Sequence, residues 1–193
     1  MSTEVLPGSR FCSGHSHLWA IGLVLCVVTA AGCPSMIALE YQPTNPLRGH
    51  GTVGTAPFRY QPSEEGRVRP RQVETNRAAM PDVFLAQEIG VFVTEALRLE
   101  LGWSGYTLKA PSDRIVSGTI TRFHLNWRRE EGRSFELSAD FTVQSGAHTL
   151  FSWHCSSVQK GSDMLRDDGI LIRKGTADCM HRFIETAQDE RIL

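Results

Sequence analysis

Three runs between residues 114 and 156 alternate apolar and polar side chains, and this two-residue period is the strongest constraint on the fold. Residues 134–144 alternate without interruption, and their apolar members are Phe135, Leu137, Ala139, Phe141 and Val143. After a tight turn at Ser145-Gly146 the apolar positions continue as Thr149, Phe151, Trp153 and Cys155. Because successive side chains of a strand point to opposite faces, we expect an antiparallel sheet with one apolar and one polar face.

The run Arg114–Arg128 supplies the first of these strands. Its predicted apolar face carries Thr119, Thr121, Phe123, Leu125 and Trp127. Arg122 then falls on the polar face, where Asp140 of the next strand is the simplest partner for a cross-strand ion pair. We interpret the aromatic residues of the apolar face as core, because a domain of this size needs them for burial.

Two segments have the period of an amphipathic helix. In the first, Asp82 occupies an N-cap position and Gly102 marks the end. The apolar stripe between them comprises Leu85, Ile89, Phe92, Ala96 and Leu99. The second helix begins at Asp168, and Gly175 is its weakest point. Its stripe comprises Ile170, Ala177, Met180, Ile184 and Ala187.

The segment before the first helix predicts one strand and one long loop. Thr52–Tyr60 alternates loosely, and Pro57 marks an edge or a strand end because it cannot donate a ladder hydrogen bond. Gln61–Pro81 is polar, and we expect a loop that is mobile or used for contact. The order β-α-β-β-β-α predicts an α+β fold. It is a two-layer sandwich, with two amphipathic helices on one face of an antiparallel sheet of about three to five strands.

The chain has room for one domain, and its charge is balanced. Its 193 residues carry 20 Lys and Arg against 21 Asp and Glu, a formal net charge of −1. This balance argues against a nucleic-acid partner, because neutralising phosphates needs a surplus of cations. The apolar share of 41% is too high for a disordered chain. We assign residues 52–190 to a single α+β domain.

An uncharged run, Leu18–Ala31, ends shortly before Cys33. At ~1.5 Å per residue it would span about 21 Å, less than the ~30 Å hydrocarbon core of a bilayer. That length is typical of an export signal, which we assign to residues 1–32. The sequence Ala30-Ala31-Gly32-Cys33 resembles a bacterial lipobox, which implies cleavage between Gly32 and Cys33 and a diacylglycerol on the Cys33 thiol. A transmembrane anchor and an ordinary secretory signal are the alternatives.

Residues 33–51 contain three prolines and no sustained periodicity. We interpret them as a proline-rich tether between the lipid on Cys33 and the domain. Pro34 stands where many inner-membrane lipoproteins carry aspartate. We therefore expect a lipid-anchored protein of the bacterial cell membrane, in the outer membrane facing the periplasm rather than in the inner membrane.

Cys155 and Cys179 are the only cysteines after Cys33. One lies on the apolar face of a predicted strand and the other on the helix that covers this face. In an oxidising periplasm a disulfide between them would close a loop of about 25 residues and contribute ~3 kcal/mol on chain-entropy grounds. The pattern slightly favours two separate buried thiols, and both states remain open.

Arg67, Arg69 and Arg71 alternate within the expected loop. Guanidinium groups suit phosphate and carboxylate, so these residues are candidate contacts for a lipid headgroup or an acidic partner protein. The alternative is a solvated loop, because the glutamates of the same segment offset the positive charge.

His124, His154 and Cys155 are the residues most suited to catalysis or metal binding. Alternation places His154 and Cys155 on opposite faces of one strand, so they cannot act together. Two histidines without cysteine or carboxylate ligands make a poor zinc site. We expect no catalytic residues, no metal, and no cofactor besides the covalent lipid.

Four segments resemble YajG-type bacterial lipoproteins: the lipobox at Cys33, the strand GTAPFRY, the helix ending LRLELGWSGYTL and the strand RIVSGTITRF. In outline the chain is also similar to LptE-like lipoproteins and to auxiliary lipoproteins of envelope ABC transport. The resemblance implies a membrane-tethered α+β domain with a structural or accessory role in the cell envelope, whose partner is an envelope protein or a lipid. The alternative is an auxiliary component of lipid or LPS transport that shields an acyl chain between the first helix and the sheet.

Overall fold

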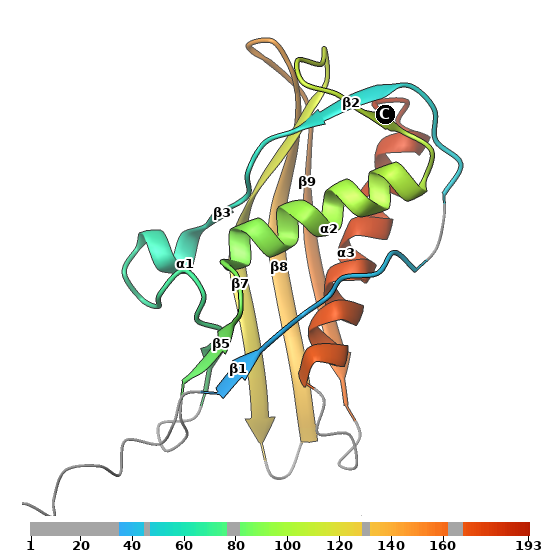
Figure 1. The fold of residues 1–193 in the computed structure, drawn as a ribbon. Coiled ribbons are helices and arrows are strands. Elements are labelled where there is room, and N and C mark those ends of the chain that lie inside the picture. The colour runs from blue at the N-terminus through green and yellow to red at the C-terminus, as the bar shows by residue number, and fades with distance from the viewer. Residues whose placement is uncertain (1–34, 45–46, 77–81, 129–131, 162–167) are drawn as a thin grey trace, which may run out of the picture. The chain divides into compact units, whose positions relative to one another are not determined.

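The computed structural model describes residues 35–44, 47–76, 82–128, 132–161 and 168–193 (Figure 1). Within these ranges one sheet has seven strands, in the order β6-β2-β7-β8-β9, with β3 and β4 also paired to β7. Its long strands are β7 (Ile115–Arg128), β8 (Gly132–Ser145) and β9 (His148–Lys160). Its short strands are β2 (Thr52–Thr55), β3 (Arg59–Tyr60), β4 (Glu74–Thr75) and β6 (Thr107–Leu108). A separate parallel pair joins β1 (Ser35–Ile37) to β5 (Val83–Leu85).

The three long strands form the antiparallel unit that alternation predicts. In β8 every apolar residue from Phe135 to Val143 is buried, and the polar residues between them are not. The sheet is wider than expected and mixed, because β2, β3 and β4 lie parallel to β7 on its other side. These strands are too short for a two-residue period to reveal them.

A β-bulge in β7 changes which residues face the core. The register between β7 and β8 shifts between Ile120 and Arg122, so Thr121 is an extra residue. Ile120 is fully buried, and so are Phe123 and Leu125 beyond the bulge. The predicted apolar face is therefore correct from Phe123 onward and wrong before it, because an inserted residue reverses the alternation.

Two long helices, α2 (Ile89–Trp103) and α3 (Asp168–Asp189), cover the apolar face of the sheet, and α1 (Gln61–Glu64) is a single turn (Figure 1). The expected α+β class is confirmed. Phe183 of α3 stacks on Phe141 of β8 with 4.5 Å between ring centroids. Gly175 is a point of close approach rather than a weakness, because a Cβ there would lie 2.7 Å from the Phe135 ring. The helix packs closely on β8 because this position has no side chain.

Helix α2 begins later than its stripe predicts. Asp82 does not cap it; Val83 and Leu85 are buried in β5, and Glu88 occupies the N-cap position. Val83 and Leu85 have the two-residue spacing of a strand. Leu85 also fits the predicted helical stripe, so the short strand was not recognised from the sequence. The helix ends at Trp103, one residue beyond Gly102.

Two segments expected to be irregular are packed against the domain. In the predicted tether, β1 pairs with β5, and the buried Tyr41 hydroxyl donates to Glu100 of α2 at 2.5 Å. Burial and this carboxylate raise the pKa of Tyr41 above its usual value. In the predicted loop Gln61–Pro81, α1 and β4 are regular and residues 77–81 lie outside the described residues. The composition of these two segments therefore did not reveal that they make tertiary contacts.

Strand β9 forms an edge of the sheet, and α3 reaches over it. Arg182 of α3 donates to the main-chain carbonyl of Ser156 at 3.1 Å. The guanidinium carbon of Arg182 also lies 5.6 Å from the centroid of the Trp153 ring. A cationic side chain thus covers part of the edge strand.

Candidate functional site

The predicted lipid attachment point adjoins the folded domain. Gly32 and Cys33 lie outside the described residues, but β1 begins at Ser35. Ser35 pairs with Val83, and its N–H donates to the Asp82 carbonyl at 3.1 Å. A lipid on Cys33 would therefore be followed almost at once by residues fixed to β5. The chain has no long free spacer at this point.

An exposed apolar side chain and two arginines lie near this entry point. Met36 of β1 is 68% exposed, and it pairs with Phe84 of β5. The Arg69 guanidinium lies 5.7 Å from the centroid of the Phe84 ring. The Leu85 N–H donates to the carbonyl of Arg71 at 2.8 Å. The main chain of Arg69–Arg71 is therefore fixed beside the β1–β5 pair.

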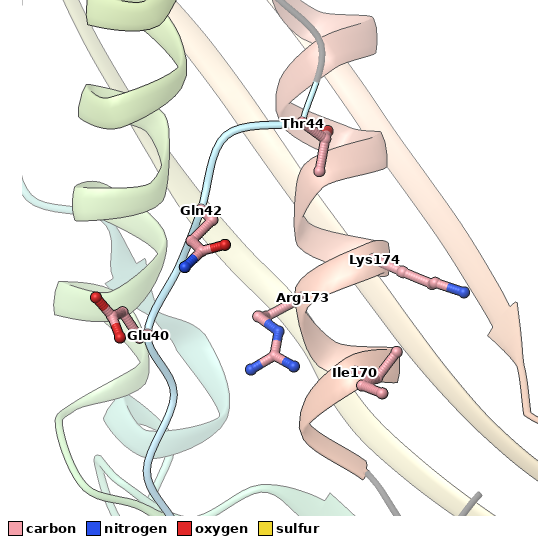
Figure 2. A pocket seen from close by; sticks show the side chains of 6 residues that line it. All are labelled: Glu40, Gln42, Thr44, Ile170, Arg173 and Lys174. Carbon is pink, nitrogen blue, oxygen red and sulfur yellow. The ribbon is translucent and has the colours of Figure 1, made fainter.

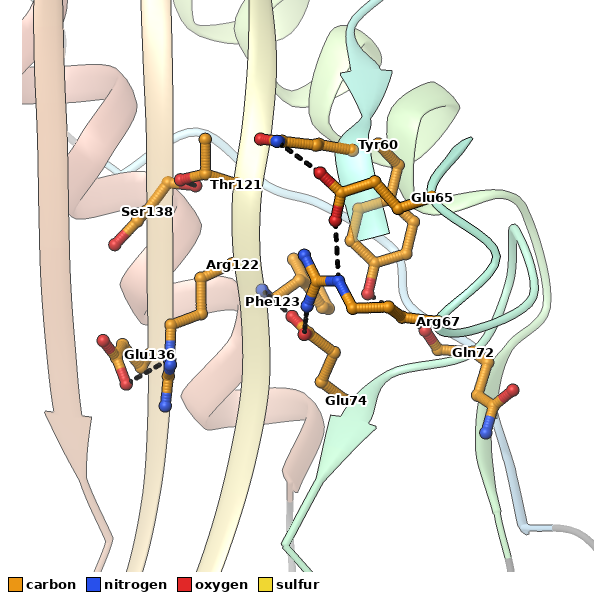
Figure 3. Close-up of polar contacts among 11 residues, drawn as sticks. Tyr60, Glu65, Arg67, Gln72, Glu74, Thr121, Arg122, Phe123, Glu136 and Ser138 are labelled. Atoms are coloured by element: carbon orange, nitrogen blue, oxygen red, sulfur yellow. Dashed lines mark hydrogen bonds and ion pairs between the residues drawn. The ribbon is translucent and has the colours of Figure 1, made fainter. Parts of the chain in front are cut away.

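Arg67, the third predicted anion contact, is engaged within the chain (Figure 3). Its guanidinium donates to Glu65 at 2.8 Å and to Glu74 at 2.9 Å. Glu74 also accepts the main-chain N–H of Phe123 on β7 at 2.9 Å. Hydrogen bonding from Arg67 lowers the pKa of Glu65 below its usual value. Arg67 thus ties this segment to the sheet, and two carboxylates already compensate its charge.

The same segment is also held through Tyr60. Its hydroxyl donates to the main-chain carbonyl of Gln72 at 3.2 Å (Figure 3). Burial, followed by the negative charge of Glu74, raises the pKa of Tyr60 above its usual value. The phenol therefore stays protonated and keeps its role as donor over the physiological range.

Cys155 of β9 and Cys179 of α3 form a disulfide, with 5.7 Å between their Cα atoms. Both residues are fully buried. This bond joins the edge strand to the helix that covers it, and it removes both thiols from nucleophilic chemistry. Of the two states that the sequence left open, the structure has the bridged one.

The polar face of the sheet carries ion pairs. Arg122 bonds Glu136 at 2.6 Å, and not Asp140 as expected, because the bulge places it opposite Ser138. Asp140 instead contacts His154 at 2.7 Å, and both side chains are exposed. Within the described ranges no three His, Cys, Asp or Glu residues gather as a metal site. The face is a solvated surface suited to polar contact.

A groove of about 370 Å³ runs between residues 40–44 and α3 (Figure 2). Its walls are Glu40, Gln42 and Thr44 on one side and Ile170, Arg173 and Lys174 on the other. Both cations come from α3, and the carboxylate of Glu40 comes from the opposite wall. The groove is open and of mixed charge, which suits a polar segment of a partner better than a small apolar ligand.

The space between α2 and the sheet is filled by side chains. Phe92 of α2 meets Phe123 edge-on at 6.5 Å, and Phe123 meets Phe135 at 4.8 Å. All three residues are fully buried. This packing counts against the alternative in which an acyl chain lies between the first helix and the sheet.

In the part of the chain that the structure describes, no helix is both long enough and apolar enough to cross a membrane. This finding concerns the helices of the folded domain. The predicted export signal lies outside the described residues.

Comparisons with known proteins identify the fold. No family model and no curated protein matches the chain. A protein of family DUF330 from Xanthomonas campestris has a TM-score of 0.64 at 9% identity, covering 81% of this chain and 99% of that one. An uncharacterized protein has a TM-score of 0.53 at 12% identity, covering 79% and 98%. Lipoprotein GNA1162 from Neisseria meningitidis has a TM-score of 0.38 at 10% identity, covering 72% and 96%. The first two likenesses show a shared α+β fold, and the TM-score of the third is too low to show one.

Proposed function

We propose that this protein is a lipid-anchored, non-catalytic accessory protein of the bacterial envelope, attached through an acylated Cys33. The observation that carries the proposal is a short apolar run that ends at a lipobox, two residues before Ser35, which is already paired with β5. The resemblance to YajG-type lipoproteins supports the same assignment. Pro34, which stands where many inner-membrane lipoproteins carry aspartate, favours outer-membrane sorting with the domain in the periplasm.

The arrangement around β1 supports a domain held close to the lipid surface. With Cys33 acylated, the exposed Met36 side chain would lie at the membrane together with Arg69 and Arg71. A cationic and apolar surface of this kind suits the anionic headgroups of a phospholipid leaflet. The partner would then bind elsewhere on the domain, and the polar sheet face and the groove of Figure 2 are the surfaces available.

A binding role is favoured over catalysis by the state of the reactive side chains. Cys155 and Cys179 are joined to each other, so neither is a free thiolate. His154 contacts Asp140 on an open face where water has full access, whereas catalytic groups gain their strength in water-excluded sites. The domain thus holds a partner, an envelope protein or a lipid, rather than transforming a substrate.

Metabolic labelling with radioactive palmitate tests the attachment in a bacterial host. We expect label in the wild-type chain and no label in Cys33→Ser, which should also keep its export signal uncleaved. Cys12→Ser is the matched control, since it removes another cysteine of the N-terminal segment and should label like wild type. Equal labelling of Cys33→Ser and wild type would refute the proposed anchor.

A further inference from the structure

A hollow of about 480 Å³ is lined by the segment before β2 and by the C-terminal end of the chain. Figure 1 shows this C-terminal end at the opposite end of the domain from β1. Arg48 and His50 line it from the segment before β2, Arg114 from the turn before β7, and Arg191 from the end of α3. Tyr106 and Gln188 complete the polar lining, with the Gln188 amide donating to the Tyr106 hydroxyl at 2.8 Å. Its size is that of a small-molecule site.

Arginine is the main charged residue type that lines this hollow. Arg67, Arg122 and Arg133 each bond a carboxylate, but no described carboxylate forms an ion pair with any of the three arginines of the hollow. Asp113, Asp189 and Glu190 are neighbours in sequence and do not line it. Three arginines from separate segments therefore line one hollow, and Leu193, the last residue given, lines it as well.

Arg191 holds a backbone conformation that glycine would adopt at lower cost. Its φ is 57°, in the left-handed region. The Arg191 N–H donates to the Gln188 carbonyl at 2.9 Å, and the Ile192 N–H donates to the Ala187 carbonyl at 2.8 Å. This is the Schellman ending of a helix, in which the residue at this position is usually glycine. An arginine at this position carries a small backbone cost that glycine would avoid.

The walls of the hollow are fixed by main-chain contacts. The Gly49 N–H donates to the Ser104 carbonyl at 2.6 Å, and the Thr107 N–H donates to the Gly51 carbonyl at 2.9 Å. Gly49 packs directly against the Tyr106 ring, in space that a Cβ would occupy. The cations are therefore presented on an ordered frame, which lowers the entropic cost of binding.

From these observations we propose that the hollow binds a phosphate-bearing ligand, with the phosphate oxygens among Arg48, Arg114 and Arg191. Guanidinium forks match phosphate geometry, and the Tyr106 hydroxyl and the His50 ring add shorter-range donors. The inference does not depend on acylation of Cys33. The phosphate belongs either to a soluble phosphomonoester or to the phosphodiester headgroup of a phospholipid.

Isothermal titration calorimetry on the full chain in neutral detergent tests the site, with inorganic phosphate as the probe. We expect saturable binding that Arg191→Gly weakens about 10-fold or more, the effect of losing one charged hydrogen bond. Arg191→Gly should leave the thermal midpoint unchanged or raised, because glycine suits the helix ending. A merely structural role for Arg191 as a cation near the helix C-terminus predicts no change in phosphate affinity.

Two further variants and two further probes complete the experiment. Arg114→Gln, which is outside any helix, should weaken binding by a similar factor, and Lys174→Gln, which removes the same charge from the far end of α3, should not. Tighter binding of glycerol 3-phosphate than of glycerophosphoglycerol assigns the site to a soluble monoester, and the reverse order assigns it to a headgroup. Absence of phosphate binding, or equal affinity in wild type and Arg191→Gly, overturns the proposal.

Discussion

Strand β7 separates two regions of the sheet that are built differently. In the antiparallel region, β8 and β9 follow β7 in chain order as long strands under α3. In the parallel region, β2, β3 and β4 come from separated segments and contribute two to four residues each. Alternation over many residues specifies the first region. The second depends on individual side chains, such as Glu74 on the Phe123 N–H. The pairing of the long strands is thus specified by their own alternation. The pairing of the short strands depends on tertiary contacts.

The largest expected effect comes from the core of the antiparallel region. Phe141→Ala should lower the free energy of unfolding by about 3–5 kcal/mol, because this fully buried ring packs on Phe183 and on Phe58. Leu150→Ala on the exposed part of β9 is the control and should change it by less than about 0.5 kcal/mol. Chemical denaturation measures both. Similar losses in the two variants would show that burial does not stabilise this region as described.

Removing the disulfide tests whether the antiparallel region is also stabilised by covalent linkage. The double variant Cys155→Ala, Cys179→Ala should lose about 3 kcal/mol, the chain-entropy value for a loop of this separation. Dithiothreitol should destabilise the wild type and leave the double variant unchanged. Mass spectrometry under non-reducing conditions should detect the linked peptides. Two alkylatable thiols in the wild-type chain would contradict the bridge.

The smallest effect is expected in the parallel region, where one carboxylate connects two segments. Glu74→Ala leaves the Phe123 N–H and the Arg67 guanidinium without this acceptor and should cost about 1–3 kcal/mol. Glu74→Gln retains an acceptor oxygen and should cost less. Amide hydrogen exchange should localise the loss to β4 and leave β8 protected. Equal exchange in both regions would mean that they open together.

Much of the antiparallel region could be predicted from the sequence, because local pattern and tertiary structure agree there. The alternation of β8 and β9 and the stripe of α3 led to the correct elements. The bulge at Thr121 could not be predicted, since an inserted residue leaves no local signal and simply reverses the pattern before it. β5 was assigned to a helix because Leu85 fits the helical stripe of Ile89 and Phe92 as well as the two-residue spacing of a strand.

The candidate sites were harder to predict, because they depend on contacts between distant residues. The alternation of Arg67, Arg69 and Arg71 suggested one anion site, but Arg67 bonds Glu65 and Glu74. The basic hollow was missed altogether, since Arg48 and Arg191 lie near opposite ends of the described chain. The only local signal is that Arg191 follows a long helix at the position where glycine usually stands.

The contact of Arg182 with the Ser156 carbonyl has a consequence for the protein in a crowded setting. A long edge strand such as β9 offers a row of main-chain groups on which a second strand can grow into an intermolecular sheet. With the proposed lipid anchor, molecules would meet at high effective concentration on a membrane surface, which would favour such growth. Because Arg182 donates to the Ser156 carbonyl, a second strand would have to displace this side chain before it could pair with β9 at that point.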